Sequence, residues 1–295
     1  MIDLHCHSTA SDGCDAPAAL IELARAAGLE ALAITDHDTF AGYDEALPVA
    51  RKASFPLICG IELSTRILDE TDPASRSAHI LGYFFQPPSA DFRQWLGTLR
   101  SRRRVRNTGI AKKLQALGMD VTLEEAEALG RNITSRPHFA RVMLQKGYVD
   151  SMEAAFQRYL GEHGVAYVER EDPSAAEGIR RLRDAGGVAS LAHPTRLRKR
   201  DPLEEEQLIA SLVDAGLDAI EVWHSDHDAA DRDRYSRLAE KYALCMTGGS
   251  DYHGANKPDI ALGRGRNASH CVPSALLDDL RARAAHRESR AGLDV

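Results

Sequence analysis

The amino-acid sequence predicts an α/β fold in which a barrel of strands and helices carries a helical insertion. Short apolar runs alternate with helical patterns through most of the 295 residues. Such repeated units imply a parallel sheet, either in a barrel or in a doubly wound arrangement. Between about residues 91 and 165 the alternation stops, and helical segments follow one another with no strand between them. We interpret this stretch as an insertion in an α/β barrel.

The apolar runs predict the strands, which fall in chain order at residues 2–4, 31–34, 57–61, 78–83, 188–192, 219–222 and 244–247. A helical pattern at residues 17–27 separates the first two strands. It begins with Pro17 after the candidate cap Asp15, and proline is favoured at the first helical position.

Within the insertion, helical patterns are predicted at residues 94–117, 123–129, 136–146 and 152–160. No low-complexity tract marks its borders, which are therefore approximate. The resulting division is a barrel domain of residues 1–90 and 166–295 and a helical insertion of residues 91–165, expected to cap the barrel.

Composition narrows the class of protein. The net charge of −7 argues against bulk affinity for duplex DNA, although a basic pocket for a small anion is compatible with it. The five cysteines are odd in number and form no CxxC pair, so neither a disulfide framework nor a thiolate zinc site is expected. No apolar run is long enough to span a membrane, and no signal-like segment follows Met1. A cytoplasmic location is therefore expected.

Histidines and carboxylates follow the ends of the predicted strands. His5 and His7 follow the first strand, with Asp12 just beyond, and His79 begins the fourth. The other strand-end residues are Asp36, His37, Glu62, His193, Asp251 and His253. In barrel enzymes the C-terminal ends of the strands converge on one mouth, so these side chains are expected to meet.

The residue types in these clusters fit metal ions. In the pair His5 and His7, alternation along an extended chain lets both imidazoles face one side, and Asp251 and His253 repeat this spacing. Nitrogen and oxygen ligands without thiolate suit Mn²⁺, Fe²⁺ or Zn²⁺, and a carboxylate such as Glu62 can bridge two ions. A lone HxH pair is weak evidence, whereas the ordered set of clusters is much stronger.

The motifs in this order resemble the PHP (polymerase and histidinol phosphatase) superfamily over nearly the whole chain. The matching segments are Asp3-Leu4-His5-Cys6-His7-Ser8, Ser11-Asp12-Gly13, Thr35-Asp36-His37-Asp38, Gly60-Ile61-Glu62, His79-Ile80-Leu81-Gly82, Ala192-His193-Pro194 and Gly249-Ser250-Asp251-Tyr252-His253. The resemblance implies a distorted (β/α)7-type barrel with a helical insertion domain. It is strongest to the branch of 3′,5′-nucleotide bisphosphate phosphatases and 5′→3′ exoribonucleases (RNase AM, TrpH-type), whose insertion carries a segment like Ser135-Arg136-Pro137-His138-Phe139-Ala140.

This resemblance implies three divalent metal ions, most readily Mn²⁺, with Fe²⁺ or Zn²⁺ as alternatives. It assigns the first ion to His5, His7, Glu62 and Asp251, the second to Glu62, His79 and His193, and the third to Asp12, His37 and His253. The catalytic group is then His5, His7, Glu62, Asp251 and His253. Asp36 is expected to orient a ligand imidazole.

The resemblance also implies that Arg103, Arg106 and Arg136 contact substrate phosphate. Guanidinium groups suit this role because they bind phosphate oxygens in a bidentate manner, and a spacing of three places Arg103 and Arg106 on one helical face. A solvated basic helix face is the alternative for such a charge run. Arg196 and His138 are further candidates for substrate binding, whereas His138 could instead pack within its helix.

Other histidines and the tryptophans give weaker signals. His224 and Trp223 follow a strand end and are candidates for the mouth of the barrel, with Trp223 a weak candidate for stacking on a base. The remaining histidines are interpreted as surface residues, namely His163, His227, His270 and His286.

The expected activity is metal-dependent hydrolysis of a phosphate ester in a 3′,5′-bisphosphonucleotide, such as pAp to AMP and phosphate. Short 5′-phosphorylated oligoribonucleotides, degraded 5′→3′, are a related substrate class. Two alternatives remain: a phosphatase of a non-nucleotide substrate such as histidinol phosphate, and a non-catalytic metal-binding module. The complete ligand set argues against the second alternative, and the Arg-rich insertion argues against the first.

Overall fold

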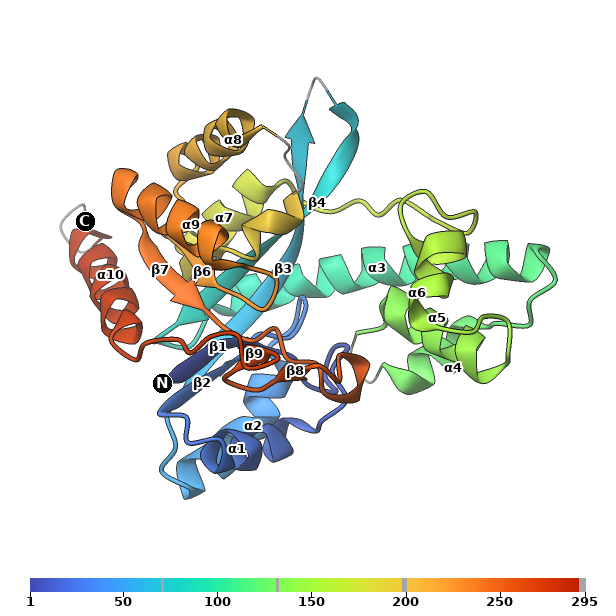
Figure 1. Cartoon of the computed structure of the whole chain (residues 1–295), viewed down its shortest axis with the longest axis horizontal. Helices are drawn as coiled ribbons and strands as arrows, with labels where there is room; N and C mark the ends of the chain where they lie inside the picture. Colours follow the sequence, from blue (N-terminus) through green and yellow to red (C-terminus); the bar gives the residue numbers. More distant parts are fainter. Residues whose placement is uncertain (70–71, 131–132, 198–200, 292–295) are drawn as a thin grey trace.

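The computed structural model describes residues 1–69, 72–130, 133–197 and 201–291, and its centre is a sheet of seven strands (Figure 1). The strands are hydrogen-bonded in sequence order. They are β1 (Ile2–Cys6), β2 (Ala31–Ile34), β3 (Leu57–Asp69), β4 (Asp72–Phe84), β5 (Val188–Leu191), β6 (Ala219–Trp223) and β7 (Cys245–Gly248). All seven predicted strands are present.

The sheet curves into a nearly closed barrel. Two backbone hydrogen bonds join the C-terminal end of β1 to the segment that follows β7: the Asp251 N–H donates to His5 O at 2.8 Å, and the His7 N–H donates to Tyr252 O at 2.9 Å. The end of β1 and the segment after it therefore lie beside the segment that follows β7, although the two are far apart in the chain.

The sheet is mixed, which corrects the expectation of a parallel sheet. β4 runs antiparallel to both β3 and β5, while the other neighbours are parallel. β3 and β4 form a long hairpin, visible in Figure 1 as the pair of strands that extends beyond the barrel. In this hairpin Ser64 pairs with His79. The early part of β4 therefore lies at the same end of the barrel as the C-terminal ends of the parallel strands.

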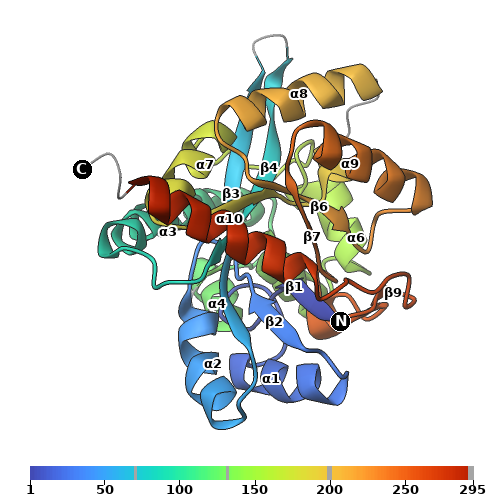
Figure 2. The same cartoon turned by 90° about the vertical axis from the view of Figure 1, so that its left-hand side faces the viewer.

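Helices pack around the outside of this sheet (Figures 1 and 2). They are α1 (Pro17–Ala26), α2 (Ala41–Lys52), α7 (Ala175–Asp184), α8 (Pro202–Asp214), α9 (Ala229–Lys241) and α10 (Leu276–Ala291). α1 begins with a proline as expected, but Ala16 occupies the capping position and makes no side-chain cap. Fully buried Ile, Leu and Val side chains fill the space between helices and strands. This packing fixes the strand ends that carry the polar residues.

The helical region stands to one side of the barrel in Figure 1. It comprises α3 (Ala90–Ala116), α4 (Leu123–Leu129), α5 (Arg136–Gln145), α6 (Met152–Ala155) and the π-helical turn η1 (Phe156–Leu160). These elements have a buried cluster of their own, built around Ile110, Leu114 and Phe139. The limits of residues 91–165 for an insertion domain stay a prediction.

Several short elements were not expected from the sequence. The strands β8 (Ile260–Ala261) and β9 (Gly265–Arg266) pair with each other, and the 3-10 turns η2 (Pro194–Leu197) and η3 (Gly254–Asn256) follow β5 and β7. Among the described helices, none combines the length and the apolar character needed to cross a membrane.

Candidate metal centre

Glu62 lies at the centre of a ring of imidazoles. Its Oε1 is 2.7 Å from His79 Nδ1 and 3.0 Å from His193 Nε2. Its Oε2 is 3.0 Å from His7 Nε2, and it also lies 3.2 Å from His37 Nδ1 and 3.4 Å from His5 Nε2. Because β3 and β4 pass this point and the ends of β1, β2 and β5 lie beside it, the fold brings together residues that are distant in sequence.

Asp251 continues the cluster beside the barrel closure. Its Oδ1 lies 3.5 Å from His7 Nε2 and 3.6 Å from His5 Nε2. Its Oδ2 is 2.7 Å from Lys257 Nζ, 2.8 Å from Arg196 Nη2 and 3.4 Å from His224 Nε2. One carboxylate oxygen therefore faces His5 and His7, and the other is held by Lys257 and Arg196.

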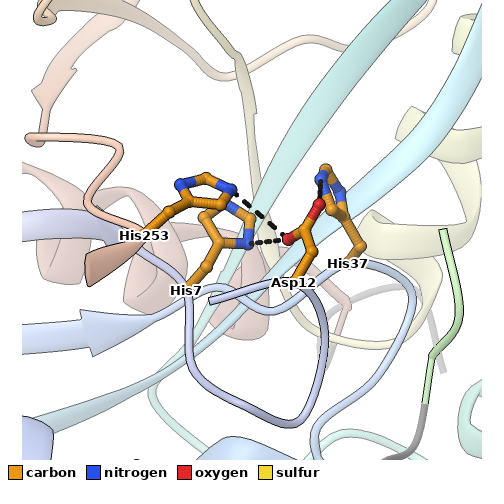
Figure 3. Close-up of side chains that lie close together, drawn as sticks. All are labelled: His7, Asp12, His37 and His253. Atoms are coloured by element: carbon orange, nitrogen blue, oxygen red, sulfur yellow. Dashed lines mark ion pairs between the residues drawn. The ribbon is translucent and has the colours of Figure 1, made fainter. Parts of the chain in front are cut away.

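Asp12 forms the third part of the cluster, drawn in Figure 3 with His7, His37 and His253. Its Oδ1 is 3.3 Å from His253 Nε2 and 3.6 Å from His7 Nδ1, and its Oδ2 is 3.7 Å from His37 Nε2. In the figure the three rings surround the carboxylate, and each dashed line ends on one of its oxygens.

All nine residues expected as ligands thus lie in one place, and their atoms fit metal ions. Each of four subsets places its nitrogen and oxygen atoms within 4.8 Å of one another: His7, Asp12, His37, His253; His37, Glu62, His79; His5, Glu62, His193; and His5, His224, Asp251. Among the described residues of the cluster, three buried ring nitrogens make no hydrogen bond of good geometry, namely His5 Nε2, His7 Nε2 and His37 Nδ1, although each lies within 3.4 Å of Glu62 Oε2. Buried imidazole nitrogens without a well-formed hydrogen bond are costly unless a ligand engages them.

The charges of the cluster are strongly coupled. Burial would by itself raise the pKa of Glu62, but the surrounding imidazoles, His79 and His37 first, outweigh it and hold the pKa well below its usual range. Burial would lower the pKa of His5, yet the carboxylates of Glu221, Glu62 and Asp251 together raise it. The carboxylates are thus held as anions, the form in which they ligate cations.

Glu221 orients two of these groups and was not anticipated. Its Oε1 lies 2.9 Å from His5 Nδ1, and its Oε2 accepts from the His193 N–H at 2.7 Å. A carboxylate on Nδ1 turns the Nε2 atom of His5 toward the cluster. The signal in the sequence was an acidic residue within the apolar run 219–222, which has to point inward or be paired.

Asp36 supports the loop after β1 rather than an imidazole. It accepts from the Ser8 N–H at 2.8 Å and from the Ser11 hydroxyl at 2.6 Å. Ser11 Oγ in turn lies 3.3 Å from His7 Nδ1. Asp36 therefore reaches the His7 imidazole only through Ser11, and its role in orienting a ligand stays a prediction.

The backbone is strained at several of these positions. His193 has φ 28°, Asp38 has φ 51° and Asp251 has φ 55°, all in the left-handed region that non-glycine residues rarely adopt. Such conformations persist where surrounding structure enforces them, and they concentrate at functional sites.

A basic cavity adjoins the cluster. Arg103, Arg106 and Arg136 all line it, together with Asp12, His37 and His79 of the cluster. The sequence did not indicate two further arginines that line this cavity, Arg66 and Arg170. Hereafter this space is called the arginine cavity. The arginines that line this cavity place positive charge at the edge of the candidate metal site.

Arg106 is a deeply buried member of this group of cations. It is 7% exposed, and its Nε has no hydrogen-bond partner among the described residues. Burial and the like charges of Arg103, Arg170 and Arg136 hold its pKa well below the usual value. A buried guanidinium among other guanidiniums is expected to bind an anion readily, because the anion relieves their repulsion.

A second cavity, the metal cavity, opens over Glu62, Asp251 and His253, and Arg196 and Lys257 line it. In the structure Arg196 is bonded to Asp226 as well as to Asp251. His138 does not line either cavity. Its Nδ1 accepts from the Ser135 N–H at 2.9 Å, which caps α5.

Two histidines interpreted as surface residues are buried. His227 is 3% exposed and His270 is 7% exposed. His227 Nδ1 lies 2.9 Å from Val222 O, and His270 Nε2 lies 3.1 Å from Gly249 O. The sequence interpretation was wrong here because both residues follow turns, where polarity alone does not reveal packing. His224 is also buried, beside Asp251, while Trp223 packs against the core.

The chain is similar to proteins of known family and structure. The PHP domain matches residues 3–187. A 5′-3′ exoribonuclease of Haemophilus influenzae is 35% identical over 85% of this chain and 89% of that protein. A phosphoribosyl 1,2-cyclic phosphate 1,2-diphosphodiesterase of Eggerthella lenta is 34% identical over 85% of this chain and 94% of that protein.

A 3′,5′-nucleoside bisphosphate phosphatase of Chromobacterium violaceum is 32% identical over 85% of this chain and 87% of that protein. Among solved structures, a protein of Bifidobacterium adolescentis described as a metal-dependent phosphoesterase superimposes with a TM-score of 0.82 at 30% identity, over 96% of both chains.

Proposed function

This chain belongs to the PHP domain family and is a metal-dependent phosphoester hydrolase, and from this premise we propose that it acts on 3′,5′-bisphosphonucleotides. The proposed reaction converts a substrate such as adenosine 3′,5′-bisphosphate (pAp) to AMP and phosphate. The observation that carries the proposal is the arginine cavity, which shares Asp12, His37 and His79 with the metal cavity. A substrate with two phosphates can reach both places at once.

We assign the metal ions to the nine strand-end residues. The first set is His5, His7, Glu62 and Asp251, the second is Glu62, His79 and His193, and the third is Asp12, His37 and His253, with Mn²⁺ as the expected ion. The mutual approach of these atoms and the imidazole nitrogens without a well-formed hydrogen bond support this assignment. When bound, such ions supply an activated water and stabilise negative charge on the phosphoryl group.

The protein's own groups position the substrate. Arg103, Arg106 and Arg136 hold the phosphate that does not react, which fixes the distance of the reacting ester from the cluster. Arg196 lines the metal cavity, where it can approach the reacting phosphate once released from Asp226. Glu221 keeps His5 in the orientation that directs Nε2 inward.

Short 5′-phosphorylated oligoribonucleotides are a second substrate class. The similarity to 5′-3′ exoribonucleases of Haemophilus influenzae and Escherichia coli favours it, at 35% and 32% identity. A histidinol phosphatase is less well supported, because histidinol phosphate has a single phosphate and leaves the arginine cavity without a ligand. A non-catalytic module is disfavoured because every expected ligand position is filled.

A direct assay tests the proposal. Purified protein with Mn²⁺ should release phosphate from adenosine 3′,5′-bisphosphate, and His7→Ala and Asp251→Ala should each abolish the release. His163→Ala, which changes an exposed histidine, serves as the matched control and should retain activity. Full activity in both site variants would rule out the mechanism. Parallel assays with a short 5′-phosphorylated RNA and with histidinol phosphate rank the substrate classes.

A further inference from the structure

The arginine cavity and the metal cavity share several lining residues, some polar and some apolar. Asp12, His37 and His79 of the barrel line both cavities, and so do Pro137 and Phe156 of the helical region. Cations and hydrogen-bond donors suffice to hold phosphate groups. An apolar wall placed between two anion-binding regions therefore calls for a different explanation.

Phe156 is the aromatic member of this wall. Among the described residues that line both cavities, it is the only Phe, Tyr or Trp. It opens the π-helical turn η1 directly after α6, and π-helical turns within helices are frequent at functional sites. Part of its side chain packs against the helical core, and the remainder is accessible.

Arg136 holds this ring in place. Its guanidinium carbon lies 6.0 Å from the centre of the Phe156 ring and 5.8 Å from that of Tyr167, which also lines the arginine cavity. Its Nη1 donates to Leu160 O at 3.3 Å, which ties it to the same π-helical turn. The aromatic ring and a phosphate-binding candidate are thus fixed relative to each other.

We propose that Phe156, supported by Arg136 and Tyr167, is a stacking platform for the nucleobase of the substrate. A nucleobase offers a flat π-face, and stacking of a base on an aromatic side chain is tolerant of base identity. A nucleoside joins two phosphates and carries its base beside them, which matches a ring between two anion-binding cavities. The inference rests on the proposed function and narrows it to substrates that contain a base.

Sequence identity does not show whether the substrate of this chain contains a nucleobase. The chain is 32% identical to a 3′,5′-nucleoside bisphosphate phosphatase and 34% identical to a phosphoribosyl 1,2-cyclic phosphate 1,2-diphosphodiesterase. The name of the second relative specifies a phosphorylated ribose without a nucleobase. An aromatic platform for a base would serve an enzyme of the first kind.

The test compares pAp with 1-deoxyribofuranose 3,5-bisphosphate, which keeps the sugar and both phosphates but lacks the base. We expect the wild type to prefer the nucleotide in kcat/KM. Phe156→Leu, which keeps apolar volume but removes the π-face, should lower the ratio of kcat/KM for the two substrates about ten-fold, mainly through the KM of the nucleotide. Phe156→Tyr should restore the ratio.

A spectroscopic measurement accompanies the kinetics. Binding of 2-aminopurine riboside 3′,5′-bisphosphate should quench its fluorescence with the wild type and Phe156→Tyr, and much less with Phe156→Leu. An unchanged kcat/KM ratio in Phe156→Leu, or equal losses for both substrates, overturns the platform. A wild type that hydrolyses both substrates equally well also overturns it. A wild type that hydrolyses neither rejects the proposed function itself.

Discussion

Asp38 accepts a hydrogen bond from the guanidinium of Arg103 and thereby joins the helical region to the loop that carries His37. The same Asp38 accepts from the Ser64 N–H at 2.8 Å through its other oxygen, and Arg170 Nη1 lies 3.7 Å away. Its own N–H donates to Glu62 O at 3.1 Å. One buried carboxylate therefore touches both the arginine cavity and the strand that carries Glu62.

Asp38→Asn should weaken both stability and substrate binding. Asparagine tolerates the positive φ of this position and can still accept from Ser64, but it leaves Arg103 and Arg170 without their shared counter-charge. We expect a loss of about 3 kcal/mol in the free energy of unfolding, typical of a buried pair deprived of one partner. The KM for pAp should rise about ten-fold, because the guanidiniums lose their fixed orientation.

Denaturant unfolding and steady-state kinetics measure these two effects. The matched control is Asp44→Asn, which removes the partner of Arg93 in a largely exposed ion pair with a distance of 2.7 Å. Exposed pairs contribute about 0–1 kcal/mol, so this variant should differ little from the wild type. Equal effects of the two substitutions would show that Asp38 has no special role.

Arg106→Met should make the free protein more stable and its anion binding weaker. Arg106 is buried beside three other guanidiniums, and removal of a desolvated like charge is expected to raise the free energy of unfolding by roughly 1–3 kcal/mol. Inorganic phosphate stabilises the wild type by binding to the folded state, and the variant should lose most of that gain.

Thermal unfolding with and without phosphate separates these contributions. Arg102→Met changes an exposed residue on the same helix and should alter neither the Tm nor its response to phosphate. A lower Tm of Arg106→Met in the absence of phosphate would mean that Arg106 serves the fold rather than the ligand.

The sequence predicted the fold well where the hydrophobic pattern alone determines it. The apolar runs located the strands because their residues are buried on both faces. The direction of β4 was missed, since a periodic pattern does not record which way a strand runs. The extension of β3 beyond residue 61 could have been found, because Ile61, Leu63, Thr65 and Ile67 favour strands and alternate with Glu62, Ser64 and Arg66.

In the candidate site, too, the sequence identified some residues and missed others. Residues adjacent to strand ends in short motifs were identified, and the structure brings them together. Glu221 and Arg170 were missed because each reaches the site through a contact with a residue far away in the chain. Lys257 was missed although it contacts Asp251 only six residues away, because it follows the turn η3 and belongs to no recognised motif. Only the tertiary structure fixes such contacts.

Asp12→Ala should remove one bound metal ion. Asp12 is the only carboxylate in its subset with His7, His37 and His253, whereas Glu62 and Asp251 serve the other subsets. The number of Mn²⁺ ions per chain, measured by elemental analysis after gel filtration, is expected to fall from three to two. Asp233→Ala, which alters an exposed carboxylate of α9, should leave it unchanged. Equal metal content in Asp12→Ala and the wild type would contradict the assignment of the third ion.

His227 should make the stability of the protein depend on pH between about 6.5 and 4. Burial lowers the pKa of its imidazole to about 4, despite the hydrogen bond to Val222 O, whereas the unfolded chain titrates near 6.5. In this window the unfolded state binds the proton and the folded state does not, so acidification favours unfolding. The contribution of neutral His227 to the free energy of unfolding is fully retained above about pH 6.5 and falls by roughly 3 kcal/mol by about pH 4.

His227→Asn isolates this contribution, because asparagine stays neutral and can donate to the same carbonyl. Urea unfolding of both proteins in EDTA, at several values of pH, should show the wild type losing stability relative to the variant as the pH falls. The exposed residue of His163→Asn provides the comparison, and that variant should follow the wild type throughout. A difference between wild type and His227→Asn that does not vary with pH would show that His227 is protonated in the folded protein to the same extent as in the unfolded chain.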